Sequence, residues 1–309
     1  MFKRVMVAVV GIPFLLLVLI LAPDWATMVL VAGMCAIGAW ELMHAVRGDR
    51  GASLASPFVW GPIFLAIMIP VKLYDFRSLL YFIGTYWADP TDTMREHMTE
   101  VTDIAMQALG SNLAQLALLV LIGLLVLFVC AIVVYGKGRP VPFADLTAAV
   151  FAGVVFPMML SCLLLLRLEG GGKALVFVPL CISFGSDTFA LFAGMLCGRH
   201  KLTPVSPKKT VEGAVGGLLG GVIGMTLFKL ISGAAMGTAL VSWAGVFLLG
   251  ILGSVIGQIG DLSFSLIKRE FGVKDYGNLL PGHGGILDRF DSVTFVAPFV
   301  WLSLTLGFI

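Results

Sequence analysis

The chain is dominated by apolar runs that are long enough to cross a bilayer. A membrane-spanning helix needs about 20 mostly apolar residues, and such runs recur along all 309 residues. A short aromatic stretch at 78–87 is expected to lie at the membrane interface. The sequence therefore predicts an all-α, polytopic integral membrane protein with about nine transmembrane helices. The expected spans are 5–22, 26–44, 57–73, 114–135, 147–166, 174–196, 213–232, 241–266 and 291–309.

Composition agrees with a membrane protein. Hydrophobic residues make up 59% of the chain and charged residues 12%, whereas a soluble domain carries roughly twice that charged fraction. The five cysteines show no CxxC spacing, and we interpret them as apolar packing residues. The first run follows Lys3 and Arg4 without a convincing small-residue cleavage site. We therefore expect a first membrane helix rather than a signal peptide.

The distribution of basic residues predicts the orientation. With a cytoplasmic N-terminus, the basic connections all fall on the cytoplasmic side, as the positive-inside rule requires. The acidic 74–113 loop, the mixed 167–173 loop and the uncharged 233–240 turn then face the opposite side. We expect a multi-pass protein of the cell membrane whose active site faces the cytoplasm. The basic connections are 45–56, 136–146, 197–212 and 267–290.

Polar groups inside the apolar runs divide the chain into two regions. Residues 1–135 carry few of them beyond Glu41 and His44, whereas the second half carries several. We therefore predict an N-terminal transmembrane scaffold over 1–135 and a C-terminal catalytic region over 136–309.

The first polar group lies in the sixth expected span, at Ser186, Asp187 and Thr188. A carboxylate inside a membrane is costly and normally faces a partner or a water-filled cavity. It is either a polar residue of helix packing or a ligand for a metal or substrate.

The second group precedes a glycine-rich span. Lys208, Lys209 and Thr210 stand just before the expected start of a helix, where free backbone N–H groups and the helix dipole favour anions. The alternative is that the lysines contact lipid headgroups. The glycines at 216, 220 and 224 form GxxxG steps, which favour close helix contacts within the chain or in a homodimer.

The third group is the end of the eighth expected span, from Asp261, together with the charged segment 265–291. Asp261, Ser265 and Lys268 are spaced to share one helical face, and Asp288 and Asp291 to share another. Carboxylates beside basic groups suit a divalent cation with oxygen ligands, although a solvated charged loop is the plain alternative. His283, between glycines, is a base, a ligand or a structural residue. We find no Walker A, GxSxG or HExxH motif, hence no support for an ATPase, serine hydrolase or zinc protease.

The charged segment resembles the phosphatidate cytidylyltransferase (CDP-diacylglycerol synthase) family. The family pattern is Ser, two residues, Lys-Arg, four residues, Lys-Asp, a Pro/Gly turn, His-Gly-Gly, two residues, Asp-Arg, one residue, Asp. The resemblance covers roughly 180–295 and includes the Ser186–Thr188 and Ser206–Gly213 elements; it departs at Leu191, where relatives often carry tyrosine. The pattern is met by Ser265, Lys268, Arg269, Lys274, Asp275, Pro281, His283, Gly284, Gly285, Asp288, Arg289 and Asp291.

The resemblance implies a nucleotidyltransferase of phospholipid biosynthesis that converts CTP and phosphatidic acid to CDP-diacylglycerol and pyrophosphate with Mg²⁺. It implies a membrane-borne lipid substrate and no nucleic acid, and it is compatible with a homodimer. Two alternatives stay open: a CTP-dependent transferase or kinase acting on another lipid such as a polyprenol, and a transporter, which would place its carboxylates near the bilayer midplane. The expected metal ligands are Asp288, then Asp261, Asp187 and Asp291; the catalytic residues are Asp288, Lys268, Arg269, Asp275 and His283; and the substrate-binding residues are Lys208, Lys209, Thr210, Ser265, Lys274 and Arg289.

Overall fold

A computed structural model of the chain describes residues 11, 13–48, 57–88, 98–137, 141–237, 240–279 and 284–308. Every regular element in this part is helical. Six helices within it are long and apolar enough to cross a membrane. The all-α membrane fold is thereby confirmed, whereas the predicted count of nine spans is not. The six are Asp24–Arg47, Met106–Gly136, Phe143–Arg167, Gly172–Cys197, Val211–Ala235 and Trp243–Glu270.

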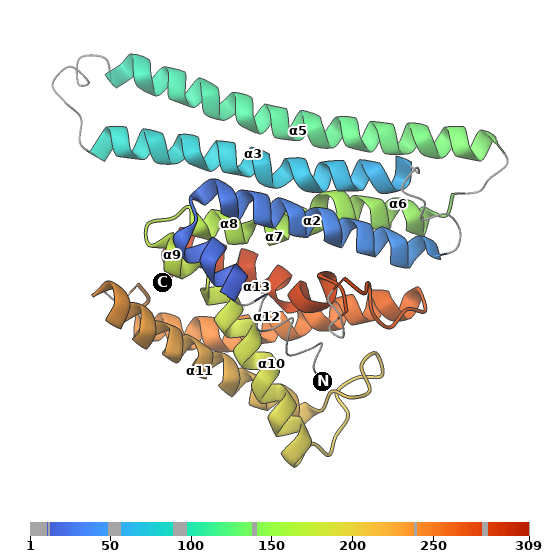
Figure 1. Cartoon of the computed structure of the whole chain (residues 1–309), viewed down its shortest axis with the longest axis vertical. Helices are drawn as coiled ribbons and strands as arrows, with labels where there is room; N and C mark the ends of the chain where they lie inside the picture. The colour runs from blue at the N-terminus through green and yellow to red at the C-terminus, as the bar shows by residue number, and fades with distance from the viewer. Residues whose placement is uncertain are drawn as a thin grey trace.

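The helices form layers (Figure 1). α5 (Met98–Gly136) lies outermost and packs on α3 (Pro57–Ala88), which in turn packs on α2 (Asp24–Arg47). On the other side of α2 lie α12 (Trp243–Glu270) and α13 (Leu287–Thr305), followed by α10 (Val178–Cys197) and α11 (Val211–Met236). The N-terminal helices thus cover one side of the helices that carry the charged segments.

The region 141–177 is a series of short helices. It consists of α6 (Phe143–Val150), the π-helical turn η3 (Phe151–Val155), α7 (Phe156–Leu160), α8 (Cys162–Arg167) and α9 (Gly172–Leu175). Pro157 opens α7 and has no N–H to donate to the preceding turn, which favours a break there. The predicted span over 147–166 thus lies within one candidate membrane helix, Phe143–Arg167, which contains a π-helical turn and a proline.

The predicted loop at 74–113 is wrong. α3 continues without interruption to Ala88, so the aromatic 78–87 stretch belongs to it, and α5 already begins at Met98. Residues 5–10 and 12 of the predicted 5–22 span lie outside the described residues, and its last part is helical over 13–16 and then forms the π-helical turn η1 (Leu17–Leu21).

Glycines set the spacing of α10, α11 and α12. A Cβ on Gly216, Gly220 or Gly224 of α11 would collide with α10, and a Cβ on Gly221 would collide with Ser254 of α12. Small residues at such positions let helix backbones approach closely. The predicted GxxxG steps are thus used within the chain, and a homodimer stays a prediction.

The aromatic core connects the outer helices to the charged loop. Phe264 of α12 is fully buried and makes edge-to-face contacts with Phe156, Tyr276 and Phe295, at centroid distances of 6.4, 6.0 and 6.3 Å. This geometry is the favoured one for aromatic pairs. The Tyr276 hydroxyl donates to the Phe264 carbonyl at 2.9 Å, which anchors the loop after α12 to the core.

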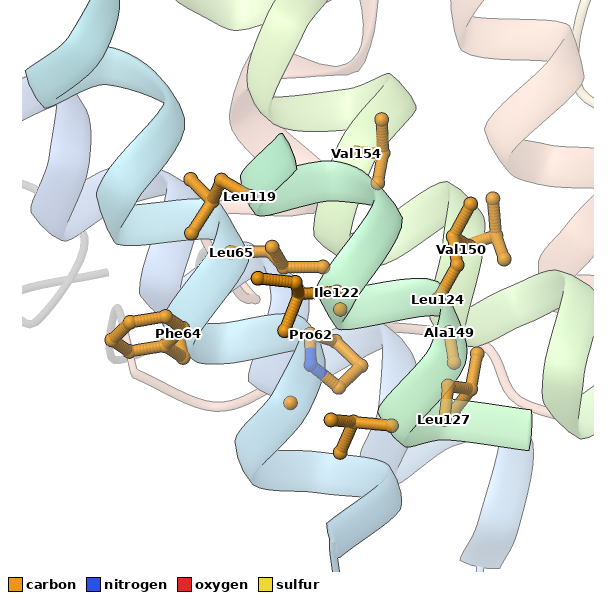
Figure 2. Close-up of a pocket in the computed structure, with 13 residues that line it drawn as sticks. Pro62, Phe64, Leu65, Leu119, Ile122, Leu124, Leu127, Ala149, Val150 and Val154 are labelled. Atoms are coloured by element: carbon orange, nitrogen blue, oxygen red, sulfur yellow. The ribbon is translucent and has the colours of Figure 1, made fainter. Parts of the chain in front are cut away.

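A separate cavity of about 160 Å³ lies among α3, α5 and the 149–154 region. Figure 2 shows it lined by aliphatic and aromatic side chains such as Phe64, Leu119 and Val154. It contains no group that could bind a nucleotide or a metal ion, so it is not the site of the chemistry.

Candidate active site

Two loops and three helix ends meet in one polar region. The loop between α10 and α11 folds back on itself: Lys201 pairs with Thr210 as an isolated bridge, and Leu202 N–H donates to the Lys209 carbonyl at 3.0 Å. Thr210 caps α11 by accepting from Gly213 N–H at 3.1 Å. This fold places Lys209 at the start of α11 and directs it toward α12.

Three aspartates from three helices interact in this region. Asp187 of α10 and Asp291 of α13 both interact electrostatically with Asp261 of α12. Lys209 donates a short hydrogen bond to Asp261 and also attracts Asp187. The predicted convergence of the three polar groups therefore exists in the folded chain.

The spacing of α12 is also as expected. Ser265 Oγ donates to Asp261 Oδ1 at 3.3 Å, one turn away on the same face. One further turn along, Lys268 donates to Asp288 Oδ1 of α13 at 2.9 Å and attracts Asp291. Lys268 thereby connects the two neighbouring carboxylates of α13 to the end of α12.

Asp288 accepts more of the described hydrogen bonds than the other aspartates of the site. Besides Lys268, it accepts from the backbone N–H groups of Tyr276 at 2.8 Å and Gly285 at 3.0 Å. A carboxylate in the first turn of a helix is favourably placed with respect to the helix dipole. Asp288 thus organises the loop in the structure, and its role as a metal ligand stays a prediction.

The remaining predicted site residues lie around this network. Arg269 donates to the Val205 carbonyl at 3.3 Å and so ties the α10–α11 loop to α12. Lys208, Lys274 and Asp275 are exposed at the loop surfaces. Arg289 interacts with Asp187. His283 and Pro281 lie outside the described residues.

The donor chemistry suits a divalent cation, because Asp187 and Asp291 both lie near enough to Asp261 to interact with it electrostatically and carboxylate oxygens are the ligands that such cations prefer. Within the described part of the chain, however, no three His, Cys, Asp or Glu side chains are arranged closely enough to hold an ion. Lysines neutralise two of the aspartates of the site: Lys209 pairs with Asp261, and Lys268 pairs with Asp288. Carboxylate oxygens are the type of ligand that a hard divalent cation prefers. The spacing of these aspartates, in contrast, is the one that they adopt with lysines as partners.

Sequence reasoning gave no role to Glu41 and none to Tyr276. Glu41, in α2, is fully buried and accepts from two backbone N–H groups at the start of α13. An isolated carboxylate within an apolar helix was the available signal. Nothing local to Glu41 in the sequence indicates a partner that lies 245 residues away.

The family model for the cytidylyltransferase family matches residues 2–306. The chain belongs to the cytidylyltransferase family. Several curated relatives of the chain are named phosphatidate cytidylyltransferase. The one from Bacillus subtilis is 39% identical over 160 residues, which are 52% of this chain and 56% of that protein. The one from Staphylococcus saprophyticus is 48% identical over 120 residues, 38% of this chain and 44% of that protein.

Another relative of the chain is named an uncharacterized protein, YnbB of Escherichia coli. It is 39% identical over 200 residues, which are 62% of this chain and 64% of that protein. The alignments thus span between about two fifths and two thirds of these three relatives.

Proposed function

We propose that the chain is a phosphatidate cytidylyltransferase, an enzyme that transfers CMP from CTP to phosphatidic acid. A phosphate oxygen of the lipid attacks the α-phosphorus of CTP. The new P–O bond forms as the bond from the α-phosphorus to the bridging oxygen breaks, and pyrophosphate leaves. The names of the relatives and the family membership support this reaction.

The observation that carries the proposal is the meeting of three aspartates with Lys209 and Lys268. The nucleophile is already anionic at neutral pH, so no side chain needs to activate it. The difficulty is the mutual repulsion of two phosphate-bearing substrates, and fixed positive charge reduces it. Lys209 and Lys268 are placed to hold phosphate oxygens, with Lys208, Arg269 and Arg289 nearby.

A divalent cation, which we propose is Mg²⁺, would be held by Asp187, Asp261 and Asp291, with Asp288 as a further ligand. When bound, it supplies positive charge to the departing pyrophosphate. These aspartates would position the cation, and Lys209 and Lys268 would then be available to bind the substrates.

The site must admit CTP from water and a lipid from the bilayer. Asp187 is exposed on α10, beside the exposed apolar side chains of Phe184 and Leu191. This surface supports lateral entry of the lipid headgroup from the cytoplasmic leaflet, while the connecting segments 198–210 and 271–279 border the aqueous side. The cytoplasmic orientation rests on the positive-inside distribution of basic residues.

The proposal is tested with the purified protein in detergent. Labelled CTP, phosphatidic acid and Mg²⁺ should give lipid-extractable cytidine label and pyrophosphate, both abolished by EDTA and restored by added Mg²⁺. Asp288→Asn should lower turnover by about 100-fold or more, while a folded protein is retained. Label that appears with a polyprenol or another lipid phosphate, but not with phosphatidic acid, would support the alternative lipid substrate.

A transporter is the alternative outside enzymes. Its carboxylates would be expected at the bilayer midplane, whereas Asp288 stands in the first turn of α13 and Lys268 in the last turn of α12. Uptake of a substrate into sealed vesicles without any labelled lipid would favour the transporter.

A further inference from the structure

Glu41 is the only carboxylate of α2 that is fully buried, and all its described contacts are with the charged loop. Its Oε1 accepts from Ile286 N–H and its Oε2 from Leu287 N–H, both at 3.0 Å. These amides belong to the first turn of α13, where backbone N–H groups have no partner within the helix. The N-cap residue of this helix, Ile286, makes no side-chain hydrogen bond to the helix end. Glu41 caps α13 from the opposite half of the chain.

The loop is shaped to receive this carboxylate. A Cβ on Gly277 would lie 2.6 Å from Glu41 Oε1, and a Cβ on Gly285 would collide with the Glu41 carboxyl group. Neither glycine has a positive φ. Their lack of a side chain is therefore explained by the space that Glu41 occupies and not by backbone conformation.

Glu41 and Asp288 bind consecutive backbone amides. Gly285 N–H donates to Asp288, and the next two amides donate to Glu41. A run of backbone N–H groups that converges on anions stabilises a single loop conformation. The position of Asp288 relative to Lys268 thus depends on a residue outside the C-terminal half.

We infer that Glu41 is a positioning residue for the transfer reaction: it fixes the 284–288 backbone, so that Asp288 and Asp291 are held facing Lys268 and Asp261. The effect on catalysis rests on the proposed function. The contact between Glu41 and the start of α13 is independent of that function. Glu41 touches no reacting atom, and its effect passes through the start of α13.

Hydrogen–deuterium exchange of the full-length protein in detergent tests the contact directly. In Glu41→Ala, amides of peptides covering 284–291 should exchange at least about tenfold faster, while peptides from α11 stay unchanged. Glu41→Gln keeps one acceptor oxygen and should give an intermediate rate. Asp145→Asn is the matched control, because Asp145 is another buried carboxylate of the membrane region that pairs with Arg47 and not with the loop.

Activity separates a positioning role from a purely stabilising one. Glu41→Ala should lower kcat by about 10- to 100-fold, as losses of supporting hydrogen bonds around a metal site do. It should also raise the Mg²⁺ concentration for half-maximal activity, and change KM for CTP by less than about threefold. Glu41→Gln should recover part of the loss. Asp145→Asn should leave kcat per folded protein unchanged.

A second perturbation acts from the loop side. Gly277→Ala should displace the carboxylate and lower kcat in the wild-type background, but add nothing in the Glu41→Ala background, because coupled residues are not additive. If Glu41→Ala fails to fold, Glu41→Gln and Gly277→Ala decide the matter.

Unchanged exchange at 284–291 in Glu41→Ala overturns the inference. So does a loss of activity that only follows the folded fraction, with exchange raised evenly along the chain. A wild-type protein without cytidylyltransferase activity rejects the proposed function instead, and the exchange result would still report on the contact.

Discussion

Asp261 is the residue on which the polar network converges. It accepts from Lys209 and from Ser265, and it interacts electrostatically with both Asp187 and Asp291. These four partners lie on the α10–α11 loop, α10, α12 and α13. Its loss should therefore affect metal binding and phosphate positioning together.

We expect Asp261→Asn to reduce turnover by about 100-fold or more, since removal of one preorganised electrostatic partner costs that much. Labelled-CTP turnover and thermal unfolding in detergent measure activity and folding in parallel. The control is Asp75→Asn, because Asp75 is a half-exposed carboxylate of α3 that pairs with Lys72 and is not part of this network. Turnover of Asp261→Asn close to that of Asp75→Asn would contradict the assignment.

Tyr276 makes one contact through its side chain and another through its backbone, so a substitution can test the two separately. Its hydroxyl binds the Phe264 carbonyl, whereas its N–H binds Asp288. We expect Tyr276→Phe to lower the free energy of unfolding by about 1 kcal/mol and to keep activity within about threefold, because the backbone contact remains.

The same residue should add no pH dependence in the neutral range. Burial raises the pKa of the Tyr276 phenol, so it stays protonated in the fold. Only above about pH 10, where the unfolded phenol ionises, should the folded state lose stability through this group. A tenfold loss of activity in Tyr276→Phe, or a difference from wild type that titrates near neutral pH, would show that the hydroxyl takes part in the site.

At the level of elements, α11 presents glycines to both of the helices that it packs against, α10 and α12. Three glycines face α10, and Gly221 faces α12. Close packing of this kind leaves no room for an added methyl group, and overpacking typically costs about 1–3 kcal/mol. The positions of Asp187 and Asp261 depend on the same contacts, because these residues lie on the two helices that α11 holds.

Gly220→Ala should consequently lower the melting temperature in detergent, because the new Cβ would meet the Gly185 carbonyl and Phe189. Gly233→Ala, on the same helix, is the matched control, since nothing lies within 4 Å of the added atom. Alanine also has the higher helix propensity, so Gly233→Ala should be neutral or stabilising. Equal melting temperatures for the two variants would mean that the α10–α11 contact is looser than described.

Much of the site could be predicted from the sequence because its signals are local. The spacing of Asp261, Ser265 and Lys268 fixes a helical face, and the contact between Asp261 and Ser265 follows from it. The three-way meeting of Asp187, Asp261 and Asp291 was inferred from expected topology. The contribution of Glu41 could not be predicted from the sequence, because its partners are backbone amides that lie 245 residues or more away.

Over the whole molecule, apolar runs predicted the fold class but not the helix ends. α3 continues past its apolar run through Lys72, Asp75 and Arg77. Lys72 donates to Gln115 of α5, and Arg77 pairs with Glu169. Partners that are distant in sequence satisfy these charges, so a count of apolar residues ends the helix too early.

The orientation of the whole molecule can be measured through Cys197. It is the exposed cysteine among the five, at the end of α10 next to the basic α10–α11 loop. A membrane-impermeant thiol reagent should label it in inside-out vesicles and not in intact cells, with Cys197→Ser as the control for background. Labelling from the outside alone would reverse the proposed orientation and place the site away from cytoplasmic CTP.

The contact between Glu41 and the start of α13 also limits how such a chain can evolve. A recombinant that joins residues 136–309 to the first half of another protein inherits two glycines, Gly277 and Gly285, shaped around a carboxyl group. Unless the new first half supplies a carboxyl group at the same position, the space beside the two glycines is empty and the backbone amides of Ile286 and Leu287 lose their acceptor. The two halves can exchange many lipid-facing side chains independently, but they must inherit this one junction together.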